Sequence, residues 1–162
     1  MKNYYLKEKF FKITDHYPIL DDDGNEVFYL DQDFTFLGYR ANLYGKDRNL
    51  LFTINKKVLS LFQTFDVAFS NNDKMLVKSR ISFLKRKTDI YYKDENIKLK
   101  GSLMDLYFEI TKDNKLIGKI EKTFFAMTDT YKLTVLDENY TLCLIALCLC
   151  LNNMKDTAKN SS

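Results

Sequence analysis

This chain of 162 residues contains little of what marks several common protein classes. Its five Gly and one Pro are too few for a collagen-like protein or a proline-rich linker. Its three Cys are an odd number in one short segment and cannot form a disulfide framework, and a single His gives little support to a zinc site. The sequence has no Gly-rich phosphate-binding loop and no nucleophile elbow. It therefore predicts a protein that is not an enzyme and that has no metal and no cofactor.

The chain also lacks a hydrophobic run long enough to cross a membrane. The C-terminal segment Tyr140–Leu151 reads YTLCLIALCLCL and carries no charge, but a membrane span needs about 20 such residues. A helix that is apolar on every side must be buried, so this segment predicts a core helix. Its cysteines, Cys143, Cys148 and Cys150, are expected to be small buried hydrophobes, because the alternative, palmitoylation, needs exposed thiols. Reduced cysteines and an N-terminus without a signal-peptide stretch predict a cytoplasmic protein.

Aromatic residues and regularly spaced turns are abundant. The 13 Phe and 11 Tyr favour strands. Turn-like clusters recur mostly at steps of 24 residues and are flanked by apolar segments, which is typical of repeated hairpins. Six hairpins make about 12 strands, and closing them into a barrel removes both sheet edges and leaves room for a helix. The clusters are centred on Asp23, Asp47, Asn71, Glu95, Asn114 and Glu138.

The predicted fold is therefore mainly β (α+β), a closed antiparallel barrel of about 12 strands around a buried apolar C-terminal helix. We expect a single domain over residues 1–154 and a disordered polar tail over residues 155–162. Because the helix would supply much of the core, the chain truncated before Asp137 is expected not to fold.

A basic stretch from Lys74 to Thr88 is the best candidate for a binding site. It contains six cationic side chains and no acidic one. Arginine binds phosphate with two hydrogen bonds and lysine binds it as a point charge, so the stretch suits an anionic headgroup. The alternative is a solvated face of the barrel that discourages aggregation. The candidate ligand-binding residues are Lys78, Arg80, Lys85, Arg86 and Lys87.

Other candidate sites have weaker support. His16 could act as a general base, but no partner for it is evident, and a structural histidine is the simpler interpretation. The acidic segment Asp21–Glu26 has Glu where a calcium-binding EF-hand loop needs Gly, which favours a hairpin turn. Nucleic acid is an unlikely partner, since 22 acidic residues nearly balance 25 basic ones and no nucleic-acid-binding motif occurs.

Several segments together resemble the LURP-one-related family, also called LOR or YxjI-like, within the tubby C-terminal-like superfamily. The resemblance spans roughly Tyr4 to Met154 and implies the same barrel of 12 strands around a C-terminal helix. Many members end the helix with Asp, where this chain has Asn152 and Asn153. The segments that carry the resemblance are Tyr5–Phe11, Asp22–Gly24, Leu99–Gly101, Leu106–Tyr131 and the terminal apolar helix.

The resemblance also bears on function, although it supplies no catalytic residues. The superfamily includes the tubby proteins, which resemble phosphoinositide-binding membrane tethers, and the phospholipid scramblases. We therefore expect a non-enzymatic cytoplasmic binding module, peripheral at the inner membrane face, that recognises an anionic phospholipid headgroup or a protein partner. The alternative is a scramblase-like protein associated with the membrane, in which the apolar helix would leave the barrel for the bilayer.

Overall fold

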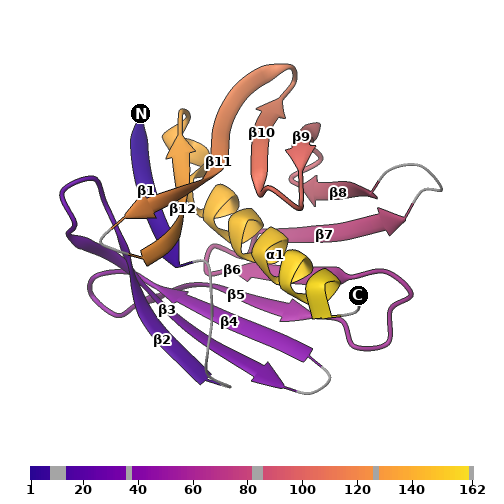
Figure 1. Ribbon diagram of the computed structural model, residues 1–162, viewed down its shortest axis with the longest axis horizontal. Coiled ribbons are helices and arrows are strands. Elements are labelled where there is room, and N and C mark those ends of the chain that lie inside the picture. The colour runs from indigo at the N-terminus through magenta and orange to yellow at the C-terminus, as the bar shows by residue number, and fades with distance from the viewer. Residues whose placement is uncertain (8–13, 36–37, 82–85, 126–127, 161–162) are drawn as a thin grey trace.

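The computed structural model describes residues 1–7, 14–35, 38–81, 86–125 and 128–160. Over these residues it contains twelve strands, one short 3-10 helix and one α-helix (Figure 1). The elements are β1 (Lys2–Lys7), β2 (Thr14–Leu20), β3 (Glu26–Thr35), β4 (Gly38–Tyr44), β5 (Leu50–Lys56), β6 (Thr64–Phe69), β7 (Lys74–Ile81), β8 (Arg86–Tyr92), β9 (Ile97–Ser102), β10 (Tyr107–Lys112), β11 (Lys115–Phe125), β12 (Thr128–Val135), η1 (Glu138–Tyr140) and α1 (Thr141–Asn160).

The strands form one antiparallel sheet that curls into a nearly closed barrel. Its order is β8-β7-β6-β5-β4-β3-β2-β1-β12-β11-β10-β9, so most strands pair with their neighbours along the chain. The two ends of the strand region meet where β1 pairs with β12, from Lys2 opposite Val135 to Lys7 opposite Thr130. α1 lies within the curled sheet (Figure 1). This architecture confirms the predicted fold class, a mainly β barrel of twelve strands around a C-terminal helix.

The barrel has a seam between β8 and β9, because these two strands do not pair along their length. The turn spacing predicts a full hairpin there. Lys93 and Asp94 form a tight turn with positive φ angles of 51° and 54°, and one isolated bridge joins Tyr92 to Glu95. Beyond it, Asn96 accepts a hydrogen bond from the amide of Asp113 (3.3 Å), and β9 pairs with β10. β8 pairs with β7 instead, so the two strands separate after the turn because each is held by its other neighbour.

The predicted turns all lie at one end of the barrel, which we call the turn end. It comprises the connections after β2, β4, β6, β8, β10 and β12, because alternate connections of an antiparallel sheet lie at the same end. Gly24, Arg48, Asn72 and Asp113 have positive φ angles there, of 79°, 57°, 71° and 48°. Such angles are what tight hairpin turns require, so these turns confirm the interpretation of the clusters. We call the opposite end the loop end.

α1 starts at the turn end and runs to the loop end, buried on every side from Cys143 to Met154. It continues to Asn160, which differs from the disordered tail predicted for residues 155–162. The first residue of this extension is bound inside the barrel, since the Lys155 ammonium donates to the Tyr131 hydroxyl (3.2 Å) and Lys155 is only 3% exposed. Over the described residues, no helix combines the length and the apolar character that crossing a bilayer requires.

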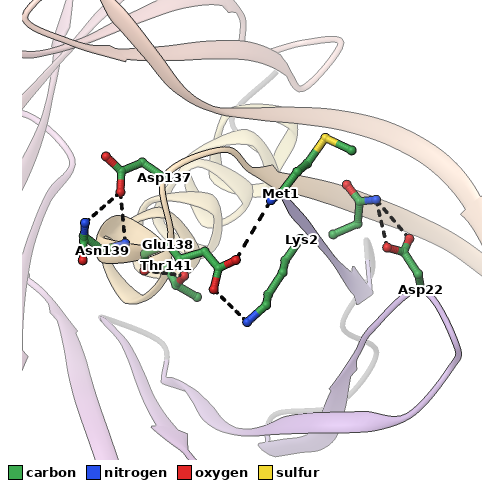
Figure 2. A network of polar contacts seen from close by, with 8 residues as sticks. Met1, Lys2, Asp22, Asp137, Glu138, Asn139 and Thr141 are labelled. Atoms are coloured by element: carbon green, nitrogen blue, oxygen red, sulfur yellow. Dashed lines mark hydrogen bonds and ion pairs between the residues drawn. The ribbon is translucent and has the colours of Figure 1, made fainter.

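The start of the chain is fastened to the segment that leads into α1. Figure 2 shows the Glu138 carboxylate facing the side chain of Lys2 (2.8 Å) and the amino group of Met1 (4.0 Å). In the same view the Asp137 carboxylate accepts hydrogen bonds from the backbone amide (3.2 Å) and the side-chain amide (3.1 Å) of Asn139. These contacts fix the entry of the helix at the turn end, beside β1.

The three cysteines are buried, as predicted, and we expect them to be unreactive in the folded protein. Burial raises the pKa of Cys143 and of Cys148 to about 12, and it raises that of Cys150 well above its ordinary value. The thiolate is the reactive form, so it is scarce near neutral pH. Ellman's reagent should therefore label no cysteine of the native protein in the time in which it labels all three in guanidinium chloride. Rapid labelling without denaturant would show that α1 leaves the barrel readily.

Candidate functional site

The basic stretch lies on two paired strands, β7 and β8, towards the loop end. The register places Arg80 opposite Lys87 and Ile81 opposite Arg86. Lys85 lies outside the described residues, and for Arg86 and Lys87 the structure describes the backbone alone. The adjacent ends of β7 and β8 thus bring together four of the five cationic positions that the sequence predicts.

The two described cationic side chains of this group already have partners. The Lys78 ammonium lies over the ring of Phe62, 5.4 Å from its centroid, and the guanidinium Nε of Arg80 forms an ion pair with the Asp89 carboxylate. Asp89 is also opposite Lys78 in the register, yet it follows the basic stretch by one residue and was missed by the sequence analysis. It offsets part of the positive charge at this surface, which therefore attracts an anion less strongly than the sequence suggests.

An exposed apolar loop lies beside this surface and was also missed. Residues 57–63, which we call the apolar loop, connect β5 to β6 at the loop end. Leu59 and Leu61 are 101% and 95% exposed, and Val58 is 51% exposed. The signal that could have identified the loop is an uncharged run, Val58 to Phe65, at a connection where polar turn residues are expected.

The apolar loop is held firmly to β7 and to α1. The backbone amide of Ser79 donates to the carbonyl of Gln63 (2.9 Å), and the Gln63 side-chain amide reaches the carbonyl of Met154 (3.5 Å). The Lys56 ammonium donates at 3.0 Å to side-chain oxygens of Gln63, Asn153 and Thr157. Burial lowers the pKa of Lys56. In Figure 1 the end of α1 lies beside the β5–β6 connection, in agreement with these contacts. The loop end therefore joins exposed leucines, cationic strand ends and the end of α1.

The other candidates from the sequence are placed elsewhere. His16 lies on β2 and pairs with Asp31 through a contact of 3.0 Å, with more than half of its side chain exposed. The Asp21 carboxylate accepts hydrogen bonds from the backbone amides of Asp23 (3.0 Å) and Asn25 (2.8 Å), so it closes the hairpin turn. Within the part of the chain that the structure describes, no three His, Cys, Asp or Glu side chains converge as metal ligands.

Comparison with known proteins places this barrel in a family. The family model described as LURP-one-related matches residues 2–152. The chain is also similar to the uncharacterized protein YxjI of Bacillus subtilis (strain 168), with 24% identity over 148 residues that cover 91% of this chain and 90% of that protein. No solved structure is significantly similar to the chain. The family match covers the whole strand region and most of α1, and the chain therefore belongs to the LURP-one-related family.

Proposed function

We propose that this chain is a non-enzymatic binding module that recognises an anionic phospholipid headgroup through Lys78, Arg80, Lys85, Arg86 and Lys87. The observation that carries the proposal is the β7–β8 register, which gathers cationic positions from both strands at the loop end. Basic residues near an anionic leaflet contribute about 1 kcal/mol each, so a cluster of this size is enough for reversible binding. The module would act in the cytoplasm, peripherally at the inner face of the membrane.

Binding to vesicles tests the proposal, with Lys85, Arg86 and Lys87 all changed to Ala as the variant. We expect the wild type to sediment with vesicles that contain phosphatidylserine and to remain in solution with phosphatidylcholine alone. At about 1 kcal/mol per lost cation, the triple variant should bind about a hundredfold more weakly. Binding should also weaken with added salt, because the Debye length falls from about 10 Å at 0.1 M to about 3 Å at 1 M.

A second triple variant controls for net charge. Lys46, Lys98 and Lys115 are exposed and lie at or near the turn end, so changing them to Ala removes the same charge from the other end of the barrel. We expect this variant to bind nearly as the wild type does. Equal losses in the two variants would contradict a local site. Binding of a soluble inositol phosphate without any binding to vesicles would instead identify a free anionic ligand, and absence of vesicle binding by the wild type would reject the proposal.

The packing of α1 does not favour the scramblase-like alternative. Moving this helix into a bilayer would empty the barrel of fully buried side chains such as Leu144, Ile145 and Leu147. It would also break the bonds of Lys56 to Asn153 and Thr157. Washing membranes with high salt separates the two hypotheses, because a peripheral protein held by charge is released and an inserted one is retained.

A further inference from the structure

We infer that the apolar loop, residues 57–63, inserts Leu59 and Leu61 into the acyl region of a membrane. The inference rests on the proposed function and adds an apolar contact to the headgroup contact. Leu59 and Leu61 are 101% and 95% exposed, so each has the whole of its aliphatic surface in water. Neighbouring exposed apolar side chains beside polar ones are a recognised mark of a protein or membrane contact, whereas single exposed apolar residues need no explanation.

The loop that presents these leucines is closed at its base by hydrogen bonds. The Lys57 amide donates to the carbonyl of Thr64 (2.8 Å), which closes the base, and the hydroxyls of Ser60 and Thr64 lie 3.1 Å apart across it. The Ser79 amide bonds the loop to β7. A loop held in this way does not have to be ordered on binding, so little of the gain from insertion is lost to conformational entropy.

The charges around the loop favour an anionic membrane over an apolar protein surface. Lys57 begins the loop that carries the leucines, and the Lys78 ammonium lies over the ring of Phe62, the residue after Leu61. Long lysine side chains can lie along apolar surface while the ammonium stays in water, so they would sit at headgroup depth once the leucines enter the acyl region. Asp66, which pairs with Lys57 at 3.3 Å, offsets part of the charge at the base of the loop. The apolar tip and its cationic base thus match the two layers of an anionic leaflet.

The first test places a dye at the tip. Leu59→Cys, labelled with an environment-sensitive fluorophore, can be compared with Leu50→Cys, which is 45% exposed at the turn-end start of β5. The native cysteines are buried and should not take the dye. With vesicles of phosphatidylcholine and phosphatidylserine, we expect a blue shift and higher intensity at position 59, and neither at position 50. An unchanged spectrum at position 59 while the protein sediments with vesicles would overturn insertion and leave the headgroup site standing.

The second test removes the leucines. Leu59→Ser combined with Leu61→Ser should keep the melting temperature of the wild type, since both side chains are exposed, and should bind vesicles about a hundredfold more weakly. Unchanged binding by this variant would refute insertion. A blue shift of equal size on phosphatidylcholine alone would support insertion and contradict the anionic headgroup. A shift without vesicles, accompanied by a dimer in sedimentation velocity, would show that a second copy of the chain covers the leucines and would reject the inference.

Discussion

Deleting residues 137–162 is expected to abolish cooperative unfolding. Five aliphatic side chains of α1, Leu144, Ile145, Leu147, Leu149 and Leu151, are at most 2% exposed inside the barrel. Burying them contributes roughly 8–15 kcal/mol gross, at about 1.5–3 each. The net stability of a whole domain is only about 5–15 kcal/mol, so the strands alone should not keep a folded barrel.

Thermal denaturation followed by circular dichroism checks this expectation. A chain that ends after Thr157 is the matched control, because it keeps the buried part of α1 and the hydroxyl that accepts a hydrogen bond from Lys56. The control should melt cooperatively, whereas the chain that ends at Leu136 should show no transition. A cooperative transition in the shorter chain would mean that the barrel does not depend on its helix.

The second large effect is expected at Gly118 of β11, against which Leu144 of α1 packs. A Cβ at this position would lie 2.8 Å from Cδ1 of Leu144 and 3.1 Å from the carbonyl oxygen of Thr134. Gly118→Ala should therefore destabilise the protein by about 1–3 kcal/mol through overpacking. Leu144→Ala should cost about 2–5 kcal/mol, because it removes a fully buried side chain and leaves a cavity.

The combined variant distinguishes this contact from a general loss of stability. Since the Leu144→Ala cavity gives room to the new methyl group, the Gly118→Ala/Leu144→Ala double variant should be more stable than the sum of the single effects implies, by about 0.5–3 kcal/mol. Gly24→Ala is a control, because a Cβ at Gly24 would meet nothing within 4 Å and its effect should add to that of Leu144→Ala. Urea unfolding measures all these variants, and strict additivity at Gly118 would refute the contact.

The turn end of the barrel was predictable because its conformation is set by residues close together in the chain. Asn, Asp and Gly adopt the positive φ angles of tight turns at little cost, so clusters such as those at Gly24 and Asn72 mark hairpins wherever they occur. The apolar segment from Tyr140 predicts a buried helix for a similar reason, since a helix without a polar side has no stable exposed position. These local features were sufficient to predict the number of strands and the central helix.

Part of the candidate site was predictable as well. The cationic residues of the basic stretch are close in sequence, and β7 and β8 pair as a hairpin, so their positions share one end of the barrel. The partners of these residues could not be predicted in the same way. Whether Arg80 meets Asp89, or Lys78 meets Phe62, depends on strand register and on a loop from another hairpin.

The sequence by itself thus determined the strand content, the turns and the buried helix, because each follows from short-range backbone preference or from hydrophobic pattern. Only the tertiary structure decided where the barrel closes, how far α1 extends and what adjoins the basic stretch. β1 pairs with β12, and Lys56 binds Asn153, 97 residues further along the chain. Whether such contacts form depends on which distant groups can satisfy one another's hydrogen bonds. Those groups meet only when the whole barrel is assembled.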